Sequence, residues 1–202
     1  MSPDAGGQSS LSMARWNFLM NFIRDRNMVG SVTPTSRRVA RRMAQLGGVE
    51  QASAVAELGP GTGAITRELL AMMPASSRLW AFEIYPLFVQ HLGKTVTDPR
   101  FILVAESAEM VARVDTGAIE AGFDAIISSI PFRLVSPDLT HRILDGAAKA
   151  LRPGAPFVTM QYHPSYLLPY IREHFAEVTR HPSVWNIPPA TLFRARNVPA
   201  AR

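Results

Sequence analysis

A stretch with three closely spaced glycines constrains the fold of this chain more than any other feature: AELGPGTGAI, at residues 56–65. It joins an apolar run, SAVAEL at 53–58, to a helical pattern, GAITRELLAMM at 63–73. The glycines therefore fall in a turn from strand to helix, where the backbone must bend sharply. A turn without Cβ atoms can also approach a ligand closely. The stretch predicts a ligand-binding turn at the first strand of a parallel α/β sheet.

Short β-rich runs alternate with helical patterns along the rest of the chain, which is typical of a parallel sheet covered on both faces. The segment 35–46 is predicted to be a helix capped by Thr33, with Pro34 at its first position. Only PSVWNIPP separates the last two strands, so these should form an antiparallel hairpin at the sheet edge. Further strands are predicted at 78–83, 100–105, 123–129, 156–162, 176–185 and 190–196, and further helices at 85–96 and 136–154.

The composition limits the domain organisation and the kinds of site. The 202 residues, 47% of them hydrophobic, suit one globular domain with a single sizeable core. No apolar run approaches the roughly 18 residues that a membrane-spanning helix needs. Without cysteine there is no thiolate metal site and no cysteine nucleophile, and no metal is expected. The net charge of +5 suits nucleic acid or an anionic membrane and does not distinguish them.

The spacing around the glycines separates two classes of cofactor. Dinucleotide sites prefer G-x-G-x-x-G, whereas here the pattern is E-x-G-x-G-x-G with the acid at Glu57. Glu83 ends the second predicted strand about 20 residues further on, where an acid can accept both ribose hydroxyls. The pattern resembles motif I of S-adenosylmethionine (SAM) dependent methyltransferases. The layout is similar to that of class I methyltransferases, which implies a Rossmann-like seven-stranded sheet in the order 3-2-1-4-5-7-6.

This resemblance implies further cofactor contacts. Glu106, Ser107 and Ala108 would flank the adenine, although the usual residue at position 106 is Asp. Gly30, Ser31 and Val32 would lie near the carboxylate of SAM. The complete set of residues expected to bind the cofactor is Gly30, Ser31, Val32, Glu57, Gly59, Gly61, Thr62, Gly63, Glu83, Ile84, Glu106, Ser107, Ala108 and Ser128.

The end of the fourth predicted strand, SSIPFR at 128–133, resembles the N-I/L-P-Y motif of amine-directed methyltransferases. In RNA adenine dimethylases that motif holds an exocyclic amine in line with the sulfonium. Here Ser129 stands in place of Asn and Phe132 in place of Tyr, so the amide that grips a nucleobase amine is missing. RNA adenine dimethylases also carry a basic helical domain after the sheet, which we do not expect in this chain. Nucleic acid is therefore not the expected partner.

Several segments together are similar to bacterial phospholipid N-methyltransferases of the short, RNA-dimethylase-like type. The more specific of these are VGSVTPTSR near the start and WNIPPATLFR near the end. The resemblance implies SAM-dependent N-methylation of phosphatidylethanolamine, and of its monomethyl and dimethyl forms, to phosphatidylcholine. It implies a phospholipid substrate on an anionic membrane surface, with no obligate protein partner. The expected catalytic residues are Ser129, Ile130, Phe132, Tyr162, His163 and Trp185; the aromatic side chains would tolerate a methylated cation, and His163 could accept a proton.

The segment SMARWNFLMNFIRDR, at 12–26, is amphipathic when placed on a helix. It is predicted to lie in the headgroup region of a membrane, with a lid over the sheet as the alternative. We expect a lead-in at 1–10, this segment at 11–34 and the methyltransferase domain at 35–202. The first residues lack a signal peptide pattern, so we expect a cytoplasmic protein held at the inner membrane. The predicted membrane contacts are Arg15, Trp16, Phe18, Leu19, Phe22, Ile23 and Arg26.

Two other functions remain open from the sequence. An RNA adenine-N6 dimethyltransferase would share the fold and the basic charge. A catalytically inactive module that binds SAM or a membrane would share much of the same sequence. The presence of Glu57, Glu83 and the three glycines favours an active enzyme over the inactive module.

Overall fold

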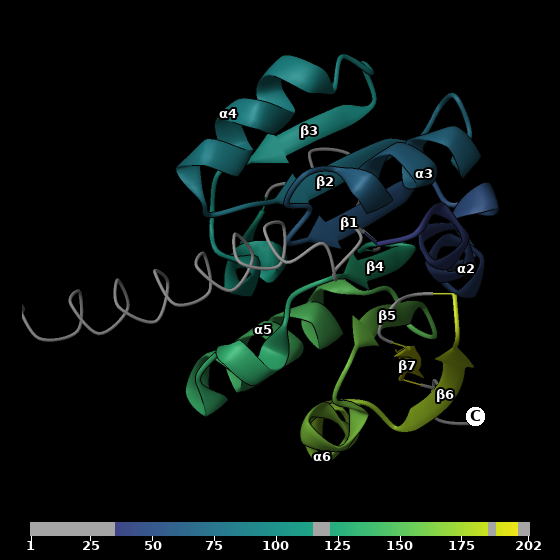
Figure 1. The fold of residues 1–202 in the computed structure, drawn as a ribbon, viewed down its shortest axis with the longest axis vertical. Helices are drawn as coiled ribbons and strands as arrows, with labels where there is room; N and C mark the ends of the chain where they lie inside the picture. The colour runs from purple at the N-terminus through teal and green to yellow at the C-terminus, as the bar shows by residue number, and fades with distance from the viewer. Residues whose placement is uncertain (1–34, 115–121, 186–188, 198–202) are drawn as a thin grey trace, which may run out of the picture. The chain divides into compact units, whose positions relative to one another are not determined.

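The computed structural model describes residues 35–114, 122–185 and 189–197. These form a seven-stranded sheet in the order β3-β2-β1-β4-β5-β7-β6, which confirms the predicted order (Figure 1). The predictions for residues 1–34, including the membrane-binding segment, concern residues outside the described ranges. The strands are β1 (Ala54–Leu58), β2 (Arg78–Phe82), β3 (Phe101–Val104), β4 (Ala125–Ser128), β5 (Pro156–Gln161), β6 (Glu177–Ser183) and β7 (Ala190–Arg196).

The first five strands are parallel, so their carboxyl ends meet at one edge of the sheet. The last two form the predicted antiparallel hairpin, and β7 pairs antiparallel with β5. Because β7 runs against both neighbours, β6 runs in the same direction as β5. Pro182 is tolerated in β6 because this strand lies at the sheet edge. Since β6 and β5 run in the same direction, the segment after β6 lies at the end of the sheet where the parallel strands also finish.

Two layers of helices cover the sheet. Apolar side chains of α2 (Arg37–Gly47) and α3 (Ala64–Met72) pack on one face with Val55, Ile127 and Val158. Those of α5 (Pro137–Ala150) and α6 (Pro164–His174) pack on the other with Leu58, Ile126 and Phe157. Figure 1 shows these pairs of helices on opposite sides of the strands. The remaining elements are α4 (Pro86–Thr95) and the 3-10 helices η1 (Val49–Gln51), η2 (Ala108–Arg113) and η3 (Phe132–Leu134).

The structure corrects two details of the sequence analysis. The cap of α2 is Ser36, whose hydroxyl accepts a hydrogen bond from the Val39 N–H, rather than Thr33. The sequence analysis also assigned no helix between β5 and β6, where α6 lies. Pro164 occupies its first turn, where a missing N–H is harmless, and Pro169 lies inside it. Two prolines in one turn and a half obscured the helical pattern.

Candidate functional site

The glycine loop joins β1 to α3 and adopts a conformation that L side chains disfavour. Gly59, Gly61 and Gly63 have φ angles of 73°, 57° and 78°, in the left-handed region. A Cβ atom at Gly63 would come 3.0 Å from the Leu92 side chain, whereas one at Gly61 would have nothing within 4 Å. The middle of the loop therefore faces open space, and its backbone is accessible to a ligand.

Glu83 follows β2 and holds this loop in place. Its Oε2 accepts a hydrogen bond from the Gly61 N–H at 3.0 Å, and its Oε1 accepts one from the Tyr85 N–H at 2.9 Å. The side chain is buried, and burial raises its pKa, while the two backbone donors oppose that rise. Each carboxylate oxygen retains a lone pair that can accept a hydroxyl hydrogen. Glu83 can therefore brace the loop and bind a ligand hydroxyl together.

Glu57 lies in β1, fully buried beneath the start of the loop. Neither of its oxygens has a hydrogen-bond partner among the described residues, and neither does the nearby Thr66 hydroxyl. Burial raises the pKa of Glu57 to about 8, and the Thr66 side chain and the Arg67 charge offset only part of that rise. A buried acid without partners is unfavourable for folding alone. Its position suits a ligand that brings a cation or donors.

The segment after β4 is tied to both neighbouring strands. The Ser129 hydroxyl donates a hydrogen bond to the Gly59 carbonyl at 2.7 Å, which links the fourth strand to the glycine loop. Ser128 accepts a hydrogen bond from the Ile130 N–H at 3.3 Å. The Ile130 carbonyl accepts one from Gln161 Nε2, at the end of β5, at 2.9 Å. The structure thus brings Ser128, Ser129 and Ile130 next to Gly59 at the strand ends.

Gln161 is the residue that the sequence analysis missed. Its side chain is buried and also donates to the Thr159 hydroxyl at 3.2 Å. A polar side chain at the end of an apolar strand is the signal that could have identified it. By holding the Ile130 carbonyl, it fixes the direction of the remaining lone pair on that oxygen.

The predicted aromatic and histidine candidates are not all placed alike. Phe132 is fully buried in the core between the sheet and α5. Tyr162 is half-buried and His163, which precedes α6, is exposed, both directly after β5. Trp185 is exposed and lies under the guanidinium of Arg38, 4.5 Å from the ring centre. The catalytic roles of these four residues stay predictions.

The other expected cofactor contacts follow β1, β2 and β3. Thr62 and Ile84 are exposed, the latter at 57%. Glu106 is exposed, Ser107 precedes η2, and Ala108 is buried at its start. These residues lie at the end of the sheet where the parallel strands finish. Their contacts with adenine or ribose stay predictions. Gly30, Ser31 and Val32 lie outside the described residues.

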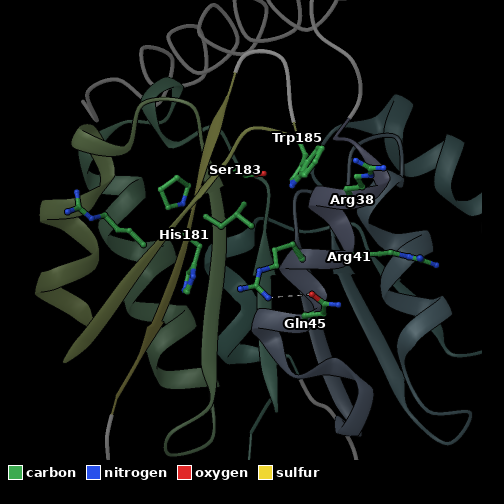
Figure 2. Close-up of a pocket in the computed structure, with 10 residues that line it drawn as sticks. Arg38, Arg41, Gln45, His181, Ser183 and Trp185 are labelled. Carbon is green, nitrogen blue, oxygen red and sulfur yellow. Dashed lines mark hydrogen bonds between the residues drawn. The ribbon is translucent and has the colours of Figure 1, made fainter.

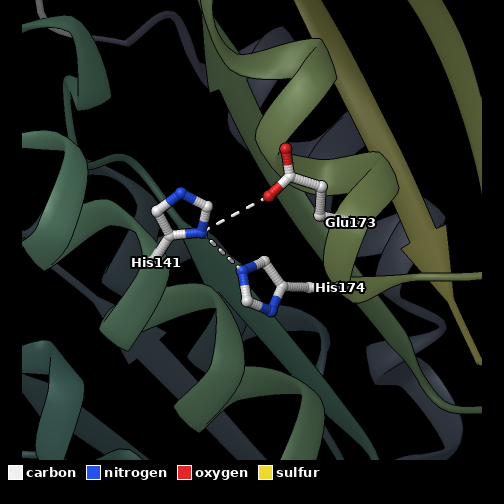
Figure 3. A group of neighbouring side chains, drawn as sticks. All are labelled: His141, Glu173 and His174. Carbon is white, nitrogen blue, oxygen red and sulfur yellow. Dashed lines mark hydrogen bonds and ion pairs between the residues drawn. The ribbon is translucent and has the colours of Figure 1, made fainter.

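A separate polar cluster joins α5 to α6. His141 Nδ1 lies 3.1 Å from His174 Nε2 and 3.6 Å from a carboxylate oxygen of Glu173 (Figure 3). These three ligand atoms all lie within 4.8 Å of one another, close enough to share a metal ion. In the described protein the two rings already hydrogen-bond each other, and the tilted Tyr170 ring lies 5.1 Å from that of His141. The cluster connects two helices on the face opposite to α2 and α3.

The sheet order and the loop together define the class of the protein. A 3-2-1-4-5-7-6 sheet with glycines after β1, an acid after β2 and an unpaired buried acid in β1 is a class I SAM-dependent methyltransferase fold with a cofactor site that fits SAM. Residues 34–183 match the family model of the methyltransferase small domain, and the chain belongs to that family.

Two solved structures with similar folds contain S-adenosylhomocysteine. A Burkholderia thailandensis 1,6-didemethyltoxoflavin-N1-methyltransferase with bound S-adenosylhomocysteine has a TM-score of 0.67 and 18% identity, covering 98% of this chain and 93% of its own. The N-methyltransferase NodS of Bradyrhizobium japonicum WM9, with S-adenosylhomocysteine, has a TM-score of 0.63 and 17% identity, covering 82% and 88%. At these identities the likeness concerns the fold alone.

The relatives found by sequence are ribosomal RNA methyltransferases. The small-subunit ribosomal RNA methyltransferase A of Nocardia farcinica is 30% identical over 131 residues, which are 62% of this chain and 39% of the relative. That of Mycobacterium bovis is 28% identical over 131 residues, 62% of this chain and 36% of the relative. The chain thus spans less than half the length of these curated relatives.

In the part of the chain that the structure describes, no helix is long and apolar enough to cross a bilayer.

Proposed function

We propose that this methyltransferase acts on the amine of a phospholipid headgroup, phosphatidylethanolamine and its partly methylated forms, at a cytoplasmic membrane surface. The observation that carries the proposal is the hydrogen bond from Ser129 to the Gly59 carbonyl. At the position where the base-gripping motif has an amide, this chain has a hydroxyl whose proton is already donated to the loop. Such a site offers no paired donor and acceptor for a planar nucleobase.

The residues that remain can orient a small amine. The Ile130 carbonyl, held by Gln161 at 2.9 Å, can accept a hydrogen from an ethanolamine nitrogen on its second lone pair. SAM supplies an electrophilic methyl group on a sulfonium. The amine must be neutral to attack it, and alignment of the two reactants can supply much of the acceleration. The exposed His163, beside the end of β5, is the candidate to accept the proton that the amine loses.

The buried acid and the loop are proposed to hold the cofactor. Glu57 is unpaired in the described protein, and a cationic group nearby would favour its ionised form. Glu83, already bonded to Gly61, would accept ribose hydroxyls on its free lone pairs. These roles specify which residues would bind SAM, and they do not depend on which molecule accepts the methyl group.

A second candidate is methylation of adenine N6 in RNA. The relatives described as ribosomal RNA methyltransferase A, 27–30% identical to this chain, favour it. The chain's net charge of +5 is compatible with it as well. Against it stands Ser129 in place of the amide, with its hydroxyl bonded to Gly59.

A transfer assay separates the two. The full chain is incubated with methyl-labelled SAM and a mixture of phosphatidylethanolamine vesicles and ribosomal RNA, which are then extracted apart. The proposal expects label in the lipid phase, with RNA labelled no more than in a control without enzyme. Label in the RNA phase alone would replace the lipid proposal with the RNA one. Bound SAM without label in either phase would support an inactive module.

A further inference from the structure

A basic pocket lies between α2 and the edge strand β6, outside the hydrogen-bonded site after β4. Its volume is about 560 Å³, and its charged and aromatic lining is shown in Figure 2. The Arg38 guanidinium lies over the Trp185 ring at one end of the pocket, and Gln45 and His181 lie further along it. The main lining side chains are Arg38, Arg41, Arg42, Arg180, His181 and Trp185.

The arginines of α2 divide into two groups by their partners. Arg37 and Arg41 share the Glu68 carboxylate, at 2.6 Å and 2.9 Å. Arg38 and Arg42 form no ion pair among the described residues, and no described residue lining the pocket is acidic. Unpaired cations that share one concave surface create a positive potential that attracts anions.

Arg180 and His181 of β6 also line the pocket. Arg180 is exposed and forms no ion pair among the residues that the structure describes. The pKa of His181 is lowered, first by burial and then by the charges of Arg42 and Arg194. The smaller part of this shift, from Arg42 and Arg194, reflects the positive charge near His181. Arg38 and Arg42, which form no ion pair among the described residues, suit a phosphate group, since guanidinium groups bind phosphate oxygens by directed hydrogen bonds.

Exposed apolar side chains follow β6 and, further across the sheet, β2. Val184 and Trp185, directly after β6, are 73% and 59% exposed. Leu87, in the first turn of α4 after β2, is 62% exposed. Because β6 and β2 run in the same direction, these residues all lie at the end of the sheet where the parallel strands finish. An edge with exposed aliphatic and indole groups beside cations is typical of a membrane-facing surface.

We propose that the pocket between α2 and β6 binds the phosphate of an anionic phospholipid and so holds this sheet edge against the membrane. The inference rests on the proposed function for its choice of a membrane as partner, but it assigns a site separate from methyl transfer. The exposed Leu87 and Val184 favour lipid over nucleic acid, because aliphatic side chains carry no hydrogen-bonding group or charge for phosphates or base edges. One face of the Trp185 ring is also covered by Arg38, which limits base stacking.

The test measures binding of the full chain to vesicles in the absence of SAM. Sedimentation with phosphatidylcholine vesicles, with and without phosphatidylglycerol, compares the wild type with the Arg38→Gln/Arg42→Gln variant. The matched control is Arg113→Gln/Arg172→Gln, which removes the same charge from exposed positions on η2 and α6. Loss of two cations at the surface should weaken binding to phosphatidylglycerol vesicles by about 30-fold. The control should change it by less than about threefold.

Three outcomes would overturn the inference. The first is wild-type binding by the pocket variant, and the second is equal loss in the control, which would make the effect one of net charge. The third is pocket-dependent binding of ribosomal RNA without any binding to anionic vesicles, which would assign the pocket to nucleic acid. Circular dichroism shows whether the variants are folded. The vesicle assay measures binding and no methyl transfer. If vesicle binding depends on the pocket but the transfer assay finds no lipid methylation, only the proposed function is refuted.

Discussion

The buried carboxylate of Glu83 accepts a hydrogen bond from the Gly61 N–H at 3.0 Å, across 22 residues of sequence. It accepts a second from the Tyr85 N–H at 2.9 Å, so both oxygens hold backbone donors. Gly61 lies in the part of the loop that faces open space, with a φ angle of 57°. One acid after β2 thus holds the backbone of the glycine loop at Gly61. Loop order and ligand binding should therefore depend together on this carboxylate.

Replacing Glu83 by Gln tests this dependence. The amide keeps the shape but has one acceptor oxygen, so one backbone N–H loses its partner. A lost hydrogen bond to a charged group should weaken SAM binding by about tenfold or more. Isothermal titration calorimetry measures the change, with Glu50→Gln, an exposed acid in η1, as the control. Wild-type affinity in Glu83→Gln would show that this carboxylate neither orders the loop nor contacts the ligand.

The unpaired Glu57 predicts an unusual dependence of stability on pH. Its pKa is raised from 4.5 to about 8 by burial, so the folded chain keeps its proton while the unfolded chain ionises. The unfolded state then binds fewer protons, and stability without cofactor should fall as pH rises between these values. The contribution is at most about 1.4 kcal/mol for each pH unit.

Urea unfolding of the wild type and of Glu57→Gln from pH 5 to pH 8 measures this contribution. The Gln variant has no titrating group at this position, so the difference between the two proteins should grow with pH in its favour. A constant difference across the range would mean that Glu57 is already ionised in the folded chain.

The hydrogen bond from Ser129 to Gly59 predicts an effect on the cofactor rather than on the acceptor. Ser129→Ala removes one neutral hydrogen bond to the loop, which should weaken SAM binding by about fivefold. The KM for phosphatidylethanolamine should stay within about twofold, because the hydroxyl is not expected to hold the amine.

Ser77→Ala is the matched control for that variant. Its hydroxyl also donates to a backbone carbonyl, that of Pro74 at 2.6 Å, in the turn before β2. It should leave SAM binding unchanged. A large rise in the lipid KM of Ser129→Ala, with SAM binding intact, would place the hydroxyl on the substrate instead.

The pair of histidines between α5 and α6 predicts sensitivity to acid. The pKa of His174 is lowered from 6.5, first by burial and then by the charge of His141. The folded chain therefore binds fewer protons than the unfolded chain just below pH 6.5, and stability is lost as pH falls through the lowered value. His174→Gln should make thermal unfolding less dependent on pH between 5 and 7, whereas His91→Gln, exposed on α4, should not. Identical slopes in all three proteins would contradict the assignment.

The strand order was predictable because its signals are local. Gly59, Gly61 and Gly63 mark the first turn, and the short PSVWNIPP segment allows only a hairpin between the last two strands. Helix α6 was not predicted because Pro164 and Pro169 interrupt its pattern, although both are tolerated where they lie. A sequence pattern predicts the backbone geometry of a segment well when that geometry requires one particular residue type.

The arrangement of the site was less accessible from the sequence. The contact between Arg38 and Trp185 depends on β6 lying beside α2, which no spacing along the chain reveals. The bond from Gln161 to Ile130 likewise requires the pairing of β4 with β5. The burial of the Phe132 ring at the start of η3 also depends on packing against α5 and the sheet. Such placements come from packing between distant segments.

The most direct test of the account is the chemical identity of the methylated product. The full chain is incubated with SAM, phosphatidylethanolamine vesicles and ribosomal RNA, and both fractions are analysed by mass spectrometry. The account predicts phosphatidylethanolamine with methylated headgroups and adenines unchanged. Methylated adenine in the RNA, with the lipid headgroup unaltered, would contradict it.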